Sequence, residues 1–240
     1  MRNEEKWIDG YPLSYHMKQW DEPKESTKSF CKFINHKIEA DTQILDLAAG
    51  TGAPTFYLAS HFKNTTFIAS DYSKECVAIG NKIIEKKEIS NLRIQFEDWY
   101  ELQETKEYEG VISLQTLSWL KEPEQPIKRV LQKLKPRWFA LTSLFYEGDI
   151  SYEIKLDIHS NREKMHYNIY SLKHIERIVG SCGYRVSAVE KFNINVDLPK
   201  PENPDMMGTY TKHFIDEPHR VQLSGALLMP WYMIMIERQT

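Results

Sequence analysis

The chain has 240 residues, of which 41% are hydrophobic and 27% charged, so it carries enough apolar material for a sizeable core. This composition excludes disordered and fibrous proteins. Its 31 Lys and Arg residues against 34 Asp and Glu leave a net charge of -3, which provides no basic field for a nucleic acid or an anionic membrane. We therefore expect neither as a partner.

The N-terminal sequence and the cysteines indicate a cytoplasmic protein. The opening residues lack the apolar stretch of a signal peptide, and no later window approaches the roughly 18 apolar residues of a membrane-spanning helix. Cys31, Cys76 and Cys182 are far apart and show no CxxC spacing. We expect them to be reduced thiols, and we expect no metal site.

Strands and helices alternate along the first part of the chain. An aromatic-rich N-terminal segment leads into an amphipathic helix over 24–40, which begins near Ser26 or Thr27. Apolar runs predict strands over 44–49, 65–71, 92–98, 110–115 and 138–146. Helical spacing predicts helices over 56–62, 73–88 and 124–135. This order is typical of a parallel sheet with helices on both faces, whose ligands bind at the carboxyl ends of the strands.

The pattern changes after the fifth strand. Residues 150–159 and 164–171 alternate with period two around a turn, which predicts an inserted β-hairpin. A helix over 171–183, a strand over 184–198, a small hairpin of 209–214 with 220–225, and a closing strand over 227–238 follow. We see no repeat and no interdomain linker, so we expect one domain over 1–240. Its parts are an N-terminal lid and helix (1–40), a cofactor-binding core (41–146), the hairpin (150–170), and C-terminal strands with substrate-side segments (171–240).

A glycine-rich turn joins the first strand directly to a helix. Gly50 and Gly52 lack Cβ atoms, so the backbone can bend sharply and let a ligand approach the free N–H groups of the helix. Asp71 ends the second strand nineteen residues beyond Gly52, where its carboxylate could accept hydrogen bonds from ribose hydroxyls. The alternative is a structural turn followed by an aspartate that caps the next helix.

Dinucleotides and adenosyl-sulfonium cofactors both use such a turn. A dinucleotide fingerprint beginning at Gly50 requires Gly or Ala at position 55, where Thr55 stands. A count from Ala48 places Ala53 correctly but lacks the leading glycine. The spacing therefore favours the sulfonium cofactor.

The turn ILDLAAGTGAP resembles the first motif of the class I S-adenosylmethionine-dependent methyltransferases. The resemblance extends to FIASDYS, RIQFEDWYEL and VISLQTLSWLKEP, and it covers about residues 40 to 145 well. It implies a Rossmann-like, seven-stranded, mostly parallel α/β sheet with an antiparallel last strand, here with a β-hairpin inserted after strand 5. Ala48 stands where the family usually has its first glycine.

The resemblance also implies S-adenosyl-L-methionine as cofactor and a set of binding residues. The set comprises Asp46, Ala48, Gly50, Thr51, Gly52, Asp71, Tyr72, Asp98, Trp99, Gln115 and, in the lid, Tyr15 and Trp20. Asp71 would bind the ribose, Tyr72 one face of the adenine, Asp98 with Trp99 its amino edge, and Gln115 would lie near the methionyl group. Plain packing is the alternative for the aromatic residues, and a helix cap is the alternative for Gln115.

A sulfonium methyl group is already activated, so its transfer needs alignment and exclusion of water more than a catalytic base. None of the eight histidines stands out as a base, and we assign no catalytic residue. Tyr146, His166 and Tyr210 are our candidates for substrate contacts. No Asn/Asp-Pro-Pro-Tyr/Phe motif follows the fourth strand, which argues against methylation of DNA bases.

We expect methyl transfer to a small molecule, on oxygen, nitrogen or carbon, by a monomer or homodimer. The alternatives are an S-adenosylmethionine-binding module without methyl transfer and an NAD-dependent oxidoreductase. The hairpin alternation puts Ile150, Tyr152, Ile154, Leu156 and Ile158 on one face, with Met165, Tyr167 and Ile169 opposite. This face must be buried, either as a lid over the acceptor pocket, which we favour, or in a dimer interface.

Overall fold

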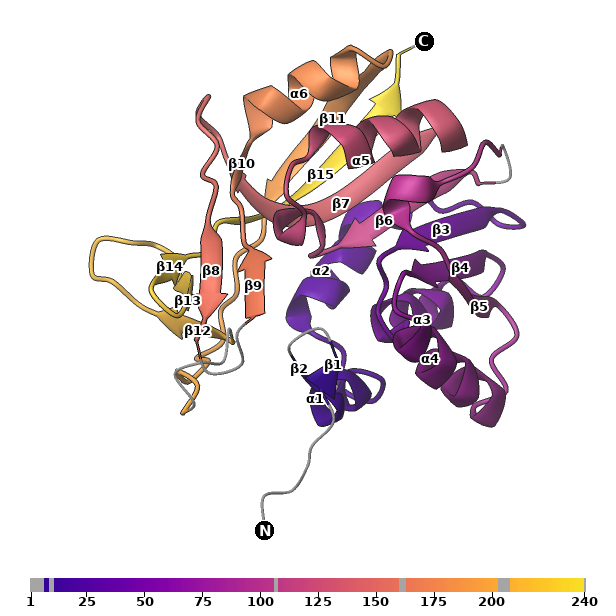
Figure 1. Ribbon diagram of the computed structural model, residues 1–240, viewed down its shortest axis with the longest axis horizontal. Helices are drawn as coiled ribbons and strands as arrows, with labels where there is room; N and C mark the ends of the chain where they lie inside the picture. Colours follow the sequence, from indigo (N-terminus) through magenta and orange to yellow (C-terminus); the bar gives the residue numbers. More distant parts are fainter. Residues whose placement is uncertain (1–6, 9–10, 106–107, 160–162, 203–207, 240) are drawn as a thin grey trace.

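The computed structural model describes residues 7–8, 11–105, 108–159, 163–202 and 208–239 (Figure 1). Its main sheet has the strand order β11-β15-β7-β6-β3-β4-β5. The bounds are β3 Gln43–Leu47, β4 Thr66–Asp71, β5 Leu92–Phe96, β6 Gly110–Leu114, β7 Trp138–Tyr146, β11 Tyr184–Lys191 and β15 Trp231–Arg238. Neighbours from β5 to β7 pair in parallel, whereas β15 is antiparallel to both β7 and β11. The predicted mostly parallel sheet with an antiparallel last strand is confirmed.

Helices cover both faces of this sheet, as predicted. On one face, α5 (Glu124–Arg129), the π-helical turn η4 (Val130–Leu134) and α6 (Leu172–Gly180) pack on β7 and its neighbours (Figure 1). On the other face lie α2 (Glu25–Ile34), α3 (Ala53–His61) and α4 (Lys74–Lys86). Both cores consist of buried aliphatic and aromatic side chains, as expected for strands that are buried on two sides.

Three helices differ from their predicted bounds, and one of them is α6, which ends at Gly180 instead of 183. Helix α2 ends at Ile34 instead of continuing to 40, because the chain turns into the 3-10 helix η1 (Asn35–Lys37) ahead of β3. Helix α3 begins at Ala53, directly after Gly52, and so starts three residues before the predicted 56. Pro54 favours this start, since a proline in the first turn of a helix sacrifices no hydrogen bond.

Residues 209–228 form a second, smaller sheet beside the main one. The predicted hairpin is present as β12 (Thr209–Lys212) and β13 (Val221–Ser224), and β14 (Leu227–Leu228) adds a third strand. The closing segment over 227–238 is therefore split, because β14 and β15 belong to different sheets. Strand β11 ends at Lys191, and the remainder of the predicted 184–198 strand is irregular.

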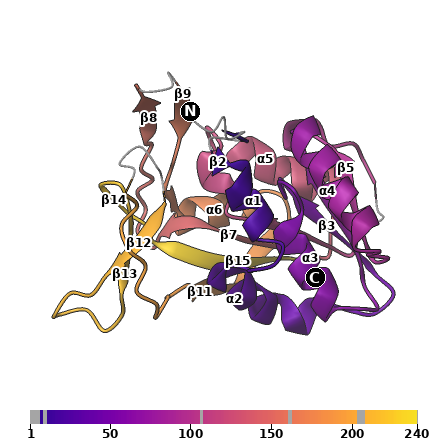
Figure 2. The same ribbon diagram turned by 90° about the horizontal axis from the view of Figure 1, so that it is seen from below.

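The inserted hairpin consists of β8 (Lys155–Ile158) and β9 (Glu163–His166), with a further antiparallel bridge between Tyr152 and Ile169. Its last predicted residues instead form β10 (Tyr170–Ser171), which pairs in parallel with the end of β7. Figure 2 shows the hairpin projecting from the body of the protein, with α1 (Leu13–Lys18) between it and α4.

The predicted apolar face of the hairpin is buried only in part. Tyr167 belongs to a third core cluster that also contains Leu144, Phe192, Ile194, Met229 and Trp231, and Leu156 and Ile169 pack against it. Ile150 and Tyr152 remain 57% and 45% exposed. The hairpin thus packs on segments of its own chain. Among the described residues, no helix combines the length and apolarity needed to cross a membrane.

Candidate functional site

The carboxyl ends of β3, β4, β5, β6 and β7 meet at one edge of the sheet, because these strands run in the same direction. The loop from Ala48 to Gly52 lies at the centre of this edge, after β3. Thr116, which follows β6, donates a hydrogen bond from its hydroxyl to the Ala48 carbonyl oxygen (3.3 Å). The structure therefore brings the motif ILDLAAGTGAP next to the motif VISLQTLSWLKEP.

Three residues of the loop have left-handed backbone conformations: Ala48 (φ 57°), Gly50 (φ 59°) and Gly52 (φ 82°). A left-handed conformation costs a residue with a Cβ atom roughly 1–2 kcal/mol, which gives a physical reason why glycine suits the position of Ala48. A Cβ atom on Gly50 would have no other atom within 4 Å. The backbone at Gly50 is consequently open to a ligand.

Asp71 holds this loop from the end of β4. Its Oδ2 accepts a hydrogen bond from the Gly50 N–H (2.7 Å), and its Oδ1 accepts one from the Ser73 N–H (2.8 Å). The side chain is only 4% exposed. Asp71 thus supports the turn that leads into α4, and a carboxylate is the kind of group that accepts hydrogen bonds from ribose hydroxyls.

Asp46 lies beneath the loop and is 1% exposed. Its Oδ2 accepts a hydrogen bond from the Thr55 hydroxyl (2.6 Å), whereas its Oδ1 has no partner among the described residues. Burial, with a smaller contribution from the negative charge of nearby Asp71, raises the pKa of Asp46 to about 7, although the hydrogen bond from Thr55 acts in the opposite direction. Asp46 is therefore a support of the loop and lies behind its ligand-facing side.

The N-terminal segment packs against the same loop. The Trp20 indole N–H donates a hydrogen bond to the Thr51 hydroxyl (3.1 Å), and its ring stacks on Phe56 with centroids 5.3 Å apart. Trp20 and Thr51 are both buried. Gln115 donates from its side-chain amide to the Ser26 hydroxyl (3.3 Å), so the predicted lid and the end of β6 are joined.

Two exposed aromatic side chains lie near Asp71. Tyr72 is 60% exposed and Phe96 is 54% exposed, and Phe96 is the neighbour of Asp71 in the pairing of β4 with β5. Our sequence prediction missed Phe96, although its position at the end of a predicted strand was a usable signal. An aromatic face at this place suits a flat purine ring.

Asp98 and Trp99 take local structural roles. The Asp98 Oδ1 accepts a hydrogen bond from the Tyr100 N–H (2.8 Å) and caps the 3-10 helix η2 (Trp99–Glu101). Trp99 is 5% exposed and donates its indole N–H to the Pro126 carbonyl oxygen (2.9 Å). Trp99 is therefore packed in the protein interior, which is the alternative that we gave for the aromatic residues. Asp98 is partly exposed and lies beside the carboxyl edge of the sheet.

The three candidate substrate residues have different surroundings. Tyr146 at the end of β7 is 40% exposed and meets Tyr152 edge to face, with ring centroids 5.7 Å apart. His166 lies in β9, and its Nδ1 is buried without a hydrogen-bond partner among the described residues. Tyr210 is buried in the small sheet, where its hydroxyl donates to the Gly225 carbonyl oxygen (2.9 Å). The structure therefore leaves Tyr146 the most accessible of the three.

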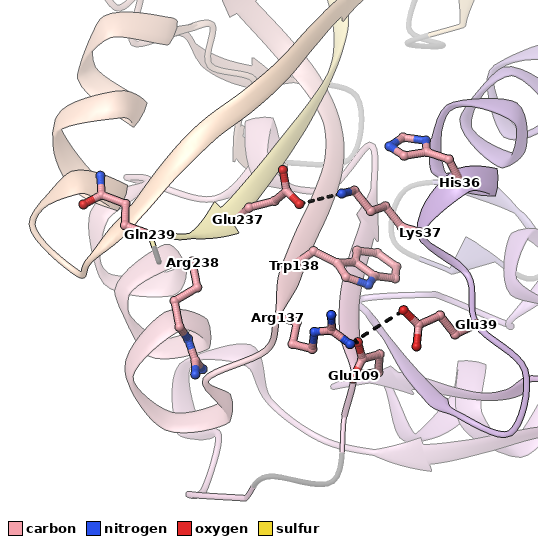
Figure 3. A pocket seen from close by; sticks show the side chains of 9 residues that line it. All are labelled: His36, Lys37, Glu39, Glu109, Arg137, Trp138, Glu237, Arg238 and Gln239. Carbon is pink, nitrogen blue, oxygen red and sulfur yellow. Dashed lines mark hydrogen bonds and ion pairs between the residues drawn. The ribbon is translucent and has the colours of Figure 1, made fainter.

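A cavity of about 380 Å³ lies at the opposite edge of the sheet (Figure 3). Lys37 binds Glu237 (2.5 Å) and Arg137 binds Glu109 (2.7 Å) across it. The charged side chains that line this cavity thus mostly form ion pairs with one another. We place the functional site at the carboxyl edge, where the strand order also places ligands of this fold.

The strand order and the glycine turn together define a Rossmann-like α/β protein of the class I methyltransferase type. Residues 38–190 match the family described as "Methyltransferase domain", and the chain belongs to this family. The family resemblance that the motifs indicated is thereby confirmed, as is S-adenosylmethionine as the family's methyl donor.

The names of the relatives indicate different methyl acceptors. The human EEF1A lysine methyltransferase 2 is 38% identical over 68 residues, which are 28% of each chain. The malonyl-[acyl-carrier protein] O-methyltransferase of Bacillus cereus is 28% identical over 106 residues, 44% of this chain and 38% of that protein. These matches span less than half of either relative.

Among solved structures, the magnesium protoporphyrin IX methyltransferase of Synechocystis PCC 6803 with bound SAH is similar in fold. It has a TM-score of 0.58 and 14% identity, and the match covers 90% of this chain and 83% of that one.

Proposed function

We propose that this protein transfers a methyl group from S-adenosylmethionine to a small-molecule acceptor. The observation that carries the proposal is the open backbone at Gly50 beside the carboxylate of Asp71, on the edge where the hairpin and N-terminal segment also converge. The exposed rings of Tyr72 and Phe96 add a surface for the adenine. These residues fit the cofactor, because the ribose hydroxyls need hydrogen-bond acceptors and the adenine ring needs an aromatic contact.

When bound, the cofactor supplies a methyl group on a positively charged sulfur whose leaving thioether is neutral. The protein's part is to align donor and acceptor and to exclude water. We propose that Gly50, Asp71 and Tyr72 hold the nucleoside, and that Gln115 orients the methionyl end from the end of β6. The hydrogen bond from the Trp20 indole N–H to the Thr51 hydroxyl holds the glycine loop in place.

The segments that cover the end of the sheet near β7 favour a small methyl acceptor. Parts of the hairpin, residues 192–198 and residues 227–231 share one apolar cluster, which includes Leu144 near the end of β7. We propose that these segments form the wall of the acceptor pocket, and that the exposed Tyr146 contacts the acceptor there. Cytoplasmic location, a single domain and a monomeric or dimeric state complete the proposal.

The size of the acceptor can be tested with S-adenosylmethionine that carries a tritiated methyl group. The purified protein is incubated with a cell extract that has been separated at about 3 kDa, and both fractions are counted after removal of the cofactor. We expect label to appear in the small fraction, because the proposed wall of the acceptor pocket would keep a folded protein away from the methyl donor. Label in protein alone would contradict the proposal, and adenosylhomocysteine binding with no labelled product would favour a binding module.

A further inference from the structure

Lys24 immediately precedes α2 and brings a positive charge to the carboxyl edge of the sheet. Its Nζ lies 3.4 Å from Oε1 of Gln115 and 5.0 Å from the ring centroid of Tyr15. Gln115 directly follows β6, and the next residue is hydrogen-bonded to the carbonyl of Ala48 in the glycine loop. The ammonium group is therefore next to the loop proposed to hold the methyl donor.

Lys24 is a half-buried residue, and its ammonium group forms no ion pair with any residue that the structure describes. The two acids nearest to it in the sequence have other partners: Glu22 binds Lys18 (3.2 Å) and Glu25 binds Lys28 (2.6 Å). A neutral amide and an aromatic ring compensate a partly buried cation less well than a carboxylate does. The edge thus carries a positive charge for which the described chain supplies no counter-ion.

We propose that Lys24 binds a carboxylate of the methyl acceptor, which makes the substrate a carboxylic acid and the product its methyl ester. This inference rests on the proposed function. In the reaction, a carboxylate oxygen forms a bond to the methyl carbon while the sulfur–methyl bond breaks and its electron pair stays on sulfur. The anion and the sulfonium become a neutral ester and a neutral thioether, and no proton moves.

The charges at this edge favour such an acceptor over an amine. A sulfonium beside Lys24 places two positive charges close together, and a carboxylate near both is attracted by both. A protonated amine is repelled by both, so the same charges select against it. Carboxylates are deprotonated at neutral pH and need no general base, which agrees with a site to which we assign no catalytic histidine.

The experiment measures the binding of simple acids to the protein saturated with adenosylhomocysteine. The probes are octanoate and benzoate, each compared with its neutral amide, and binding is followed by calorimetry. We expect at least one acid to bind about tenfold or more tightly than its amide, as a charge-assisted hydrogen bond provides. The preference should vanish in Lys24→Met and survive in Lys24→Arg. Lys28→Met is the matched control, because Lys28 lies on the same helix and already binds Glu25.

Two results would overturn the inference. The first is that neither acid is preferred over its amide by the wild-type protein. The second is a preference that Lys24→Met leaves intact. If that variant also loses about tenfold or more of its adenosylhomocysteine affinity, the result would assign Lys24 to the carboxylate of the donor. Failure of the wild-type protein to bind adenosylhomocysteine is a separate result, and it would contradict the proposed function itself.

Discussion

Replacing Gly80 by alanine is expected to weaken adenosylhomocysteine binding by about tenfold or more. Gly80 is a buried residue of α4, and a Cβ atom there would lie 2.4 Å from the carbonyl oxygen of Thr51 and 2.3 Å from Cδ1 of Ile94. The Ile94 side chain can rotate, but the Thr51 oxygen belongs to the backbone of the glycine loop. The loop or the helix must therefore move, at the cost of about 1–3 kcal/mol that is typical of overpacking.

The matched control is Gly180→Ala at the end of α6, where a Cβ atom would have nothing within 4 Å. Alanine favours helix over glycine by up to about 1 kcal/mol, so this variant should be as stable as the wild-type protein or slightly more stable. Calorimetric titration with adenosylhomocysteine and urea unfolding would be measured on both variants. Unchanged affinity in Gly80→Ala would show that the contact of α4 with the loop does not shape the site.

Replacing Asn168 by leucine is expected to lower the free energy of unfolding by about 2–4 kcal/mol. Asn168 is fully buried and joins the hairpin to the loop after β6. Its Oδ1 accepts from the Ile154 N–H (2.9 Å), and its Nδ2 donates to the Leu120 carbonyl oxygen (2.9 Å) and to the Tyr170 hydroxyl oxygen (2.9 Å). Leucine has a similar size but leaves these buried groups without their partner, at about 1–3 kcal/mol for each group left unsatisfied.

Lys164→Ala in β9 is the control for this variant. Lys164 is exposed, and it forms an ion pair with Asp157 at a separation of 3.7 Å. Its loss should change the free energy of unfolding by less than about 0.5 kcal/mol. Urea unfolding with fluorescence and circular dichroism would measure both. A loss below about 1 kcal/mol in Asn168→Leu would mean that water replaces the network and that the hairpin is not anchored there.

The succession of strands and helices from β3 to β7, and the edge at which we propose the site, follow from local patterns. The apolar runs of β3 to β7 are nearly continuous, and the glycine turn with Asp71 carries its own chemistry, so each can be read without knowledge of the rest of the chain. Ser73, which caps α4 by accepting from the Cys76 N–H (3.3 Å), is a similar local signal. Such signals depend on residues close together in sequence.

The parts that were missed depend on long-range contacts. Gly80 reads as an ordinary helix residue until α4 packs on the glycine loop. Trp99 looks like an exposed neighbour of the cofactor until Pro126 provides an acceptor for its N–H. The end of the hairpin alternates like a strand of its own, yet Tyr170 pairs with Phe145 of β7. In each case the deciding partner is more than twenty residues away, where a sequence pattern carries no information.

Isothermal titration of the wild-type protein with S-adenosylhomocysteine, beside NAD, tests the central claim most directly, and Asp71→Ala is titrated in parallel. The hydrogen bonds that we propose between Asp71 and the ribose are charge-assisted, and such bonds are worth about 1.5–3 kcal/mol each. We predict binding of S-adenosylhomocysteine without binding of NAD, and a loss of tenfold or more in Asp71→Ala. Binding of NAD without S-adenosylhomocysteine, or a loss of less than about threefold in Asp71→Ala, would contradict the assignment of the glycine turn and Asp71 to this cofactor.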